Sequence, residues 1–448
     1  MDIRGKKVLV FGSGISGEAA AGLLAEQGAQ IILYDGNEKL DRDAISRHVP
    51  EGAEIILGAF PEELADSLAL VVMSPGVPVD LPVVERMKER GIPVWGEIEL
   101  AYTYAKGDVL AITGTNGKTT TTTLLGEIMK AAAESVFIVG NIGTPYTGVA
   151  SETKEDSVTV AEISSFQLET VHSFRPKVSA ILNITPDHLN RHHTMEAYIA
   201  AKERITENQT PDDYCVLNYE DDVLRRFGES VRAQVLYFSS RRKLNKGVYL
   251  DGDRIICGID RETEICRTGD LQILGVHNYE NVMAAVAMAY VYGVPVDVIR
   301  RVVTSFKGVE HRIEFVAEKN GVAYYNDSKG TNPDAAIRGI RAMNRPTVLI
   351  GGGYDKDSSY EEWIEAFDGK VKKLVLIGAT REKIAETARR LGFTDIVMAD
   401  SFEEAFEKCT EYAEPGDAVL LSPACASWGM FKNYEERGDK FRELVEQL

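Results

Sequence analysis

Residues 108–132 of the chain read DVLAITGTNGKTTTTTLLGEIMKAA, which is an apolar strand-like run, a glycine-rich turn and a helix-like run. A strand that passes through such a turn into a helix opens an α/β unit with a parallel sheet. The turn at residues 113–119 presents backbone N–H groups at the positive end of a helix dipole, and both features attract phosphate. The segment therefore predicts an α/β domain that binds phosphate at the carboxyl end of a strand.

The side chains of this turn are of the types that bind a nucleoside triphosphate. Gly114 and Gly117 let the backbone wrap closely around phosphate, Lys118 can reach the β- and γ-phosphates, and the Thr119 hydroxyl can ligate Mg²⁺. Ile112 stands where the general P-loop pattern has its first glycine, so the turn is a shorter form of that pattern. The alternative, a glycine turn with a solvated lysine, fits the flanking strand and helix less well. We expect ATP contacts from Gly114, Thr115, Asn116, Gly117, Lys118, Thr119 and Thr120.

Strand-like and helix-like runs alternate on both sides of this segment. Before it come KKVLVFG, an alanine-rich helix at residues 15–27, AQIILYD and LALVVMSPG. After it come VTVAEIS, VSAILNIT, a helix at residues 194–208, and a β-rich stretch with VLYFSS, GVYLDGDRIICG and GDLQIL. A helix begins near His277, and a third alternating series with GVAYYND, TVLIGGG, KLVLIGA and AVLLSPA begins near Glu310.

The 448 residues suffice for about three domains of ordinary size. We predict an α/β protein with three domains in series. These are a Rossmann-like domain at residues 1–95, a central P-loop ATPase-type domain with a parallel sheet at residues 96–308, and a C-terminal Rossmann-like α/β domain at residues 309–448.

The net charge, the apolar stretches and the cysteines of the chain limit the kinds of molecule that it can bind. The formal net charge of −19 disfavours nucleic acid as a ligand. No stretch approaches the ~20 apolar residues of a spanning helix, and the N-terminus runs straight into a strand without a cleavable signal. The five cysteines lack metal-ligand spacing, which suits reduced thiols. We expect a cytoplasmic monomer that acts on small molecules and binds neither nucleic acid nor membrane.

A second glycine-rich turn, GSGISG at residues 12–17, follows the first strand and opens a helix. Asp35 ends the next strand, about where dinucleotide-binding units have the acid that binds ribose. Taken alone, this pattern indicates an NAD-dependent oxidoreductase, and a purely structural turn is a further alternative. A second phosphate loop at Lys118 has no task in hydride transfer, so a ligand other than NAD is favoured.

The short GTNGKT loop resembles that of the Mur ligase superfamily, which also includes folylpolyglutamate synthetase. Members carry a glutamate after the loop, a histidine in a T-x-D-H-L-D-x-H segment, and a lysine that becomes carbamylated. Glu162 in VAEISSFQLE, His188 in TPDHLNRH and Lys202 in YIAAKERI stand where those residues are expected. The resemblance implies catalytic roles for Lys118, His188 and Lys202, and Mg²⁺ ligation by Thr119, Glu162, His188 and Lys202.

The chemistry of these residue types agrees with the resemblance. A carboxylate and a neutral imidazole suit Mg²⁺ beside triphosphate oxygens. Protonated lysine cannot ligate a metal, whereas a carbamylated Lys202 supplies a carboxylate. From the residue alone, Lys202 is better explained as a solvated lysine on a helix surface. His192 and His193 are interpreted as surface residues at a helix entry, without a role.

The resemblance also assigns a ligand to the first domain. In the superfamily this domain is Rossmann-like but binds the uridine diphosphate of a sugar nucleotide. SPGVP at residues 74–78 forms another turn at a strand end, where ligands of open α/β sheets bind. The implied contacts are Gly14, Ile15 and Ser16 with the diphosphate and Asp35 with the uridine.

The motifs of the third domain distinguish best between the branches of the superfamily. NDSKGTN at residues 326–332 and LLSPACASWGMFKNYEERG at residues 420–438 resemble the D-glutamate-adding branch of the superfamily. Trp428 stands where Phe or Leu is usual there, and Gly429 stands where Asp is common. The resemblance implies that D-glutamate contacts Thr331, Lys356, Ser427 and Tyr434, and that nucleotide or acyl phosphate contacts Asn141, Arg312, Asp327 and Lys329.

The implied activity is that of an ATP-dependent ligase with Mg²⁺. It would add D-glutamate to UDP-N-acetylmuramoyl-L-alanine through an acyl phosphate, in cytoplasmic peptidoglycan precursor synthesis. A ligase like folylpolyglutamate synthetase is the alternative within this class, although its first third is not normally a separate GSGISG domain. A non-enzymatic P-loop switch protein would leave NDSKGTN and SPACAS unexplained.

Overall fold

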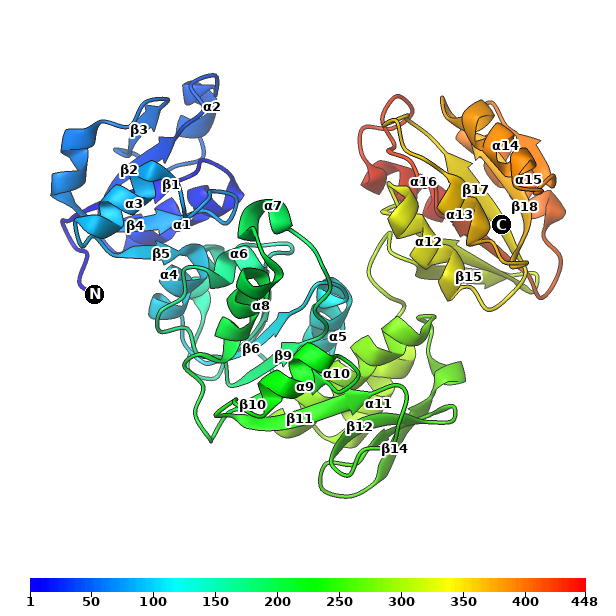
Figure 1. The fold of residues 1–448 in the computed structure, drawn as a ribbon, viewed down its shortest axis with the longest axis horizontal. Coiled ribbons are helices and arrows are strands. Elements are labelled where there is room, and N and C mark those ends of the chain that lie inside the picture. Colours follow the sequence, from blue (N-terminus) through cyan, green and yellow to red (C-terminus); the bar gives the residue numbers. More distant parts are fainter. The chain divides into compact units, whose positions relative to one another are not determined.

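The computed structural model describes all 448 residues, which form three sheets with helices around them (Figure 1). Residues 1–265 and 280–302 form one compact unit, and residues 266–279 and 303–448 form a second. The strands of the three sheets alternate with helices along the chain, which confirms the predicted α/β fold class. The domain boundaries at residues 95 and 308 stay predictions. No helix combines the length and the apolar character that crossing a bilayer requires.

The first sheet has five parallel strands in the order β3-β2-β1-β4-β5. Its strands are nearly continuous apolar runs, because a parallel sheet is covered by helices on both faces. α1 begins at Ile15, as predicted, within the GSGISG segment of residues 12–17, and this segment lies at the carboxyl edge of β1. The elements are β1 Lys7–Phe11, α1 Ile15–Glu26, β2 Gln30–Asp35, α2 Arg42–Ser46, β3 Glu54–Leu57, β4 Leu68–Met73, α3 Pro82–Glu89 and β5 Val94–Gly96.

The central sheet has nine strands in the order β14-β13-β12-β11-β10-β9-β6-β8-β7. Strands β6 to β12 pair in parallel, and β13 turns back against β12. The carboxyl ends of β6, β8 and β9 therefore meet at one edge. The strands are β6 Asp108–Thr113, β7 Val136–Gly140, β8 Val158–Glu162, β9 Val178–Ile181, β10 Tyr214–Asn218, β11 Gln234–Ser239, β12 Gly247–Asp251, β13 Arg254–Cys257 and β14 Thr263–Arg267.

Helices link and cover this sheet. They are α4 Glu97–Tyr104, α5 Lys118–Lys130, α6 Ser165–Leu168, α7 Leu189–His192, α8 Met195–Glu203, α9 Asp222–Gly228, α10 Val276–Tyr292 and α11 Val296–Ser305. One hydrophobic core joins the first sheet to the central one, because Leu24 of α1 and Ile98 of α4 share a buried cluster with Tyr146. The first and central sheets thus belong to one packed body.

The third sheet has six strands in the order β15-β16-β20-β17-β18-β19, and only the β15–β16 pair is antiparallel. Its strands are β15 Glu314–Lys319, β16 Val322–Asn326, β17 Thr347–Gly352, β18 Val371–Ile377, β19 Ile396–Met398 and β20 Ala418–Leu421. Its helices are α12 Pro333–Ala342, α13 Glu361–Glu365, α14 Arg381–Arg390, α15 Phe402–Tyr412 and α16 Tyr434–Glu446. The NDSKGTN turn follows β16, and SPACAS follows the adjacent β20.

Two predicted elements differ in the structure. GDLQIL is not a strand: the N–H of Leu271 bonds the carbonyl of Thr268 in a turn, and the strand β14 lies just before it. The apolar side chains of this segment are buried without the backbone joining the sheet. The long helix predicted at residues 194–208 ends earlier, because α8 gives way to a 3₁₀ turn at Arg204–Thr206.

Candidate active site

The glycine-rich loop lies between β6 and α5, as predicted. Gly117 caps α5 with φ of 84° and Gly114 has φ of 148°, which are conformations that side-chain-bearing residues rarely adopt. A Cβ on Gly117 would lie 2.2 Å from Oδ1 of Asn281 in α10, so the space also requires glycine. The loop therefore holds closely wrapped backbone at the N-terminus of a 13-residue helix, an arrangement that binds phosphate. Asn281 is not among the predicted site residues, and the only sign of it in the sequence is its position in the first turns of the helix that begins near His277.

The segment that follows β9 is bonded to this loop. Asn183 Oδ1 accepts a hydrogen bond from the N–H of Asn116 at 2.8 Å, and Asn183 Nδ2 donates to the Asn116 carbonyl at 3.1 Å. The hydroxyl of Thr115 donates to the Thr185 carbonyl at 3.1 Å and accepts from the Thr185 N–H at 3.0 Å. These bonds fix the stretch that leads to His188 against the phosphate loop.

Two lysine side chains meet at one backbone carbonyl. Lys118 Nζ donates to the carbonyls of Gly114 at 2.9 Å and Thr115 at 3.0 Å, and Lys202 Nζ donates to the same Gly114 carbonyl at 2.9 Å. Lys202 is 2% exposed, and its Nζ lies 4.7 Å from the centroid of the Tyr198 ring. Burial, and secondly the charge of Lys118, lower the pKa of Lys202 to about 7. Lys202 is therefore no solvated surface lysine, and its amine is largely neutral just above neutral pH.

Glu162 is the last residue of β8 and is buried. Its Oε1 accepts a hydrogen bond from Asn141 Nδ2 at 2.8 Å, whereas its Oε2 is buried without a hydrogen-bond partner. A buried carboxylate oxygen of this kind is costly unless a cation or donor compensates it. Together with the Thr119 hydroxyl in the first turn of α5, the oxygen donors fit Mg²⁺. No three His, Cys, Asp or Glu side chains gather into a metal site by themselves.

His188 lies at the entry to α7 with φ of 51°, and its side chain is half-exposed. Its ring centroid is 4.8 Å from that of Phe166, and its Nε2 is 3.5 Å from Oδ2 of Asp187. The imidazole is therefore held by an aromatic contact on one side and remains accessible on the other.

His192, by contrast, is buried, which the interpretation as a surface residue did not anticipate. Its Nε2 lies 3.0 Å from the Ser165 hydroxyl and its Nδ1 lies 3.4 Å from Oε1 of Glu169. Burial lowers its pKa. His193 is exposed, as expected, and its Nε2 lies 3.2 Å from Oδ2 of Asp80.

The GSGISG turn of the first sheet is closed tightly. A Cβ on Gly17 would lie 1.9 Å from the Gly12 carbonyl, so the start of α1 packs directly on the turn. Asp35 is drawn onto the same turn, because the N–H and hydroxyl of Ser13 donate to its Oδ2 at 3.1 and 2.8 Å. The Asp35 carboxylate, which is predicted to contact the uridine, is thus bonded to the GSGISG turn in this structure.

The predicted diphosphate contacts lie in the cap and first turn of α1. Gly14 is the N-cap with open space around its Cα, Ile15 is 72% exposed, and Ser16 is partly buried. At the same edge of the sheet lies a groove of about 530 Å³. Its lining is mainly apolar and includes Phe11, Tyr34, Phe60, Val77, Pro78 and Leu81. This edge can accept a ligand that is anionic at one end and flat and apolar at another.

In the second unit, Asp327 is buried at the start of the turn that follows β16. Its Oδ2 accepts a hydrogen bond from the Ser422 hydroxyl at 2.7 Å, and its Oδ1 accepts from the Ile313 N–H at 3.2 Å. Burial raises the pKa of Asp327 to about 7, and the partly buried Arg312 is close enough for its charge to oppose this shift. The two predicted nucleotide contacts are therefore electrostatically coupled.

Lys329 and Tyr434 lie beside His311, and Thr331 is joined to Lys329 by a backbone hydrogen bond. The Lys329 ammonium lies 5.3 Å from the Tyr434 ring centroid, and the rings of His311 and Tyr434 meet edge to face at 6.0 Å. The N–H of Lys329 bonds the His311 carbonyl at 2.9 Å, and the N–H of Thr331 bonds the Lys329 carbonyl at 2.8 Å. Burial raises the pKa of Tyr434 to about 12, so its hydroxyl stays protonated.

The remaining two predicted contacts lie around the SPACAS turn. Ser427 is buried, and the Lys356 ammonium lies 4.6 Å from the ring of Trp428, which also meets Tyr354 edge to face at 5.5 Å. The indole is 52% exposed, so Trp428 contributes a free aromatic surface to this turn. Gly429 has φ of 86°, a conformation that favours glycine over the aspartate common in the resembling branch.

A buried arginine joins these two loops, and the sequence analysis missed it. Arg437 donates from Nε to the Ser328 hydroxyl at 2.9 Å, from Nη2 to the Ser328 carbonyl at 2.8 Å, and from Nη1 to the Cys425 carbonyl at 3.2 Å. The Ser328 hydroxyl in turn donates to the Tyr434 carbonyl at 2.8 Å. The only sequence feature that points to Arg437 is its place in the KNYEERG motif.

Comparison with known proteins agrees with this geometry. Three family models match: the Mur ligase MurD-like N-terminal domain at residues 6–96, the Mur ligase middle domain at residues 112–289, and the Mur ligase glutamate ligase domain at residues 311–425. The UDP-N-acetylmuramoylalanine–D-glutamate ligases of Lachnoclostridium phytofermentans and Lachnospira eligens are 59% and 58% identical to the chain over its full length, covering 99% and 100% of those proteins. The crystal structure of MurF from Acinetobacter baumannii has the same fold, with a TM-score of 0.61 at 19% identity over 99% of this chain and 94% of that one. The chain therefore belongs to the Mur ligase family.

Proposed function

We propose that the chain is an ATP-dependent ligase that joins D-glutamate to UDP-N-acetylmuramoyl-L-alanine and releases ADP and phosphate. The full-length identity of 59% to a relative that carries this activity in its name supports the choice of substrates. The observation that carries the chemistry is the convergence of Lys118 and the buried Lys202 on the Gly114 carbonyl. A protein that only switched between nucleotide states would have no evident use for the second, buried lysine.

Phosphoryl transfer is assigned to the central sheet. The terminal carboxylate of UDP-N-acetylmuramoyl-L-alanine attacks the γ-phosphate of ATP, which gives an acyl phosphate and ADP. The glutamate amine then attacks that carbonyl, and phosphate leaves. Lys118, at the start of α5, is assigned to neutralise the charge on the transferring group, which is the main catalytic task in such reactions.

Mg²⁺ is assigned to the oxygen donors beside this loop. Thr119, Glu162 with its unpartnered Oε2, and a carbamylated Lys202 would hold it, with His188 as a ligand or as a group that positions the amine. When bound there, Mg²⁺ supplies positive charge to the phosphate oxygens. Asn141 donates a 2.8 Å hydrogen bond to Glu162 that keeps the carboxylate oriented, and it is also assigned to the acyl phosphate.

Carbamylation is a reaction for which Lys202 is suited. The nitrogen lone pair of the neutral amine forms a bond to the carbon of CO₂, and the proton of the amine passes to solvent. Only the unprotonated amine reacts, and the lowered pKa of Lys202, about 7, supplies it. The carboxylate that results is an oxygen ligand in place of a cation.

The outer sheets are assigned to the other two substrates. Gly14, Ile15 and Ser16 contact the diphosphate, and the uridine reaches the Asp35 edge, where the groove lined by Phe11 and Tyr34 accepts a flat ring. In the second unit, the carboxylates of D-glutamate are assigned to Thr331, Lys356, Ser427 and Tyr434. The nucleotide is assigned to Arg312, Asp327 and Lys329.

Two other activities remain as comparisons for the assay. A ligase that extends folate with glutamate uses the same phosphate chemistry, and an NAD-dependent oxidoreductase would use the GSGISG turn. The acceptor preference distinguishes the first, and NADH binding distinguishes the second. Cytoplasmic location, a monomeric state and independence of nucleic acid and membrane are part of the proposal.

The test measures ADP release with purified protein, ATP and Mg²⁺. We expect turnover only when UDP-N-acetylmuramoyl-L-alanine and D-glutamate are both present, and at most a trace with L-glutamate. Turnover with a folate acceptor, or NADH binding without binding of the UDP-sugar peptide in calorimetry, would refute the proposal.

A further inference from the structure

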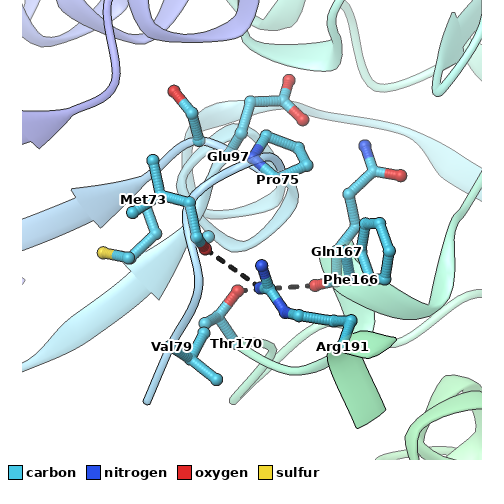
Figure 2. A pocket seen from close by; sticks show the side chains of 11 residues that line it. Met73, Pro75, Val79, Glu97, Phe166, Gln167, Thr170 and Arg191 are labelled. Atoms are coloured by element: carbon cyan, nitrogen blue, oxygen red, sulfur yellow. Dashed lines mark hydrogen bonds between the residues drawn. The ribbon is translucent and has the colours of Figure 1, made fainter. Parts of the chain in front are cut away.

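Arg191 of α7 reaches from the central sheet to the first sheet. Its Nη2 donates to the Val77 carbonyl at 2.9 Å and to Oε2 of Glu169 at 2.6 Å, and its Nε lies 3.4 Å from Oε1 of Glu169. The arginine side chain is 10% exposed, so this ion pair is well shielded from water. Figure 2 shows the guanidinium entering the narrow cavity that Met73, Val79 and Phe166 also line.

The turn that accepts this hydrogen bond packs against the GSGISG turn of the proposed diphosphate site, and its Val77 also lines the groove assigned to the uridine. Val77 lies in the SPGVP turn after β4, and Ser74 of this turn bonds the Gly12 carbonyl through its hydroxyl at 3.3 Å. A Cβ on Gly12 would lie 2.8 Å from Ser74 and 3.1 Å from Val77, so this turn and the GSGISG turn are in close contact. A shift of one turn must therefore displace the other.

The same guanidinium also contacts the segment that carries His188. It lies 4.9 Å from the centroid of the Phe166 ring, and that ring lies 4.8 Å from the imidazole of His188. The shielded ion pair with Glu169 holds the guanidinium in one orientation. One side chain thus links the turn beside the diphosphate site with the aromatic support of the candidate catalytic histidine.

We propose that Arg191 is a positioning residue, which fixes the SPGVP turn so that the UDP-sugar substrate is held in register with the phosphate loop. This inference rests on the proposed function, because it needs the first sheet to bind that substrate. Arg191 contacts the wall of the site and not the reacting atoms. Its loss should therefore weaken binding of the UDP-sugar peptide and spare the binding of ATP.

The chain offers a matched control in Arg204. This arginine also bonds the loop after α6, through the carbonyls of Leu168 at 2.9 Å, Glu169 at 2.6 Å and Val171 at 2.5 Å, but it makes no hydrogen bond to the first sheet. A structural role in the loop is therefore common to both arginines. Only Arg191 adds the bond to the SPGVP turn.

The experiment compares Arg191→Lys with Arg204→Lys. Lysine keeps a positive charge that can remain over the Phe166 ring, so the support of His188 is preserved, but it loses the planar fork that serves Glu169 and Val77 together. We expect Arg191→Lys to raise KM for UDP-N-acetylmuramoyl-L-alanine about tenfold, with kcat and KM for ATP within about twofold of the wild type. Arg204→Lys should change the two KM values by the same factor or leave both unchanged. Equal patterns in the two variants, or a parallel rise of KM for ATP in Arg191→Lys, would overturn the inference.

Hydrogen exchange provides a readout that is independent of substrate. The amides of residues 74–80 should exchange faster in Arg191→Lys than in Arg204→Lys, and unchanged exchange there overturns the positioning role. If the wild type does not turn over the UDP-sugar peptide, the proposed function is wrong. The exchange measurement still tests whether the hydrogen bond from Arg191 to Val77 fixes the SPGVP turn. Should Arg191→Lys fail to fold, Glu169→Gln loosens the same guanidinium. It should shift KM and exchange in the same direction by a smaller factor, and wild-type values in this variant also overturn the inference.

Discussion

Replacing Lys202 by alanine is the sharpest test of the phosphate chemistry. With a pKa of about 7, about 90% of the amine is neutral at pH 8, whereas the ordinary value of 10.5 would leave about 0.3%. The burial of Lys202 thus raises the share of the form that reacts with CO₂ by a factor of several hundred, on the order of the ratio of these fractions. If the carbamate supplies a ligand for Mg²⁺, Lys202→Ala should lower the rate of ADP release by about 10²–10³-fold.

The assay adds small carboxylic acids and small amines to the Lys202→Ala variant. The lost side chain is 2% exposed, so its removal leaves a buried space beside the Gly114 carbonyl. Acetate can supply there the carboxylate that the carbamate supplied, and we expect it to restore part of the activity. Wild-type activity should also fall when bicarbonate is depleted, and more steeply below pH 7, because the amine then takes up its proton.

Lys130 serves as the control for these measurements. It is the last residue of α5, half-exposed, and paired with Glu127 at 2.8 Å, so Lys130→Ala should retain nearly full activity and ignore acetate. Rescue of Lys202→Ala by methylamine but not by acetate would mean that Lys202 acts as a cation. Near-normal activity of the unrescued variant would refute any essential role.

Three further predictions concern the phosphate loop, the first sheet and the second unit. Lys118→Ala should abolish ADP release with an unchanged circular dichroism spectrum, because the Lys118 ammonium donates to loop carbonyls at 2.9 and 3.0 Å and its side chain is not part of the hydrophobic core. Gly17→Ala should abolish calorimetric binding of the UDP-sugar peptide, since its Cβ would lie 1.9 Å from the Gly12 carbonyl, whereas Gly22→Ala in the same helix meets nothing within 4 Å and should bind normally. Burial raises the pKa of Asp327 to about 7, so the folded state holds a proton that the unfolded chain has lost, and stability should fall as pH rises from about 4 to about 7. Asp327→Asn should remove this fall and raise the unfolding midpoint at pH 8 by more than at pH 5.

The parallel sheets were predictable because their strands are apolar on both faces and end in glycine-rich turns. KKVLVFG and DVLAIT became β1 and β6, and the loops after them took the predicted positions. GDLQIL misled because its alternation of apolar residues reflects burial alone. Leu271 and Ile273 are buried, yet the backbone of this segment turns instead of pairing. Alternation of apolar and polar residues indicates which side chains are buried, but it does not indicate which partners the backbone hydrogen bonds have.

The candidate site was predictable where a motif fixes local geometry and unpredictable where distant segments meet. The glycines and Lys118 follow from the loop itself. The burial of Lys202 depends on Tyr198 one helical turn away and on the Gly114 carbonyl, and only the four-residue spacing of Tyr198 and Lys202 hints at it. Arg191 has no such signal, because its partners Val77 and Glu169 belong to other segments of the chain.

The charge of the chain makes the local arrangement of cations decisive. A net charge of −19 repels the anionic substrates proposed here, but screening limits that repulsion to roughly 8 Å at physiological salt. Within that range, two protonated lysines beside one carbonyl would oppose Mg²⁺. A neutral Lys202 removes one of these charges, and a carbamate reverses it, so that one cation, Lys118, then faces two carboxylates, those of Lys202 and Glu162. In that proposed state the unpartnered oxygen of Glu162 would have a function, because together with the carbamate it would provide anionic oxygen donors of the kind that Mg²⁺ prefers.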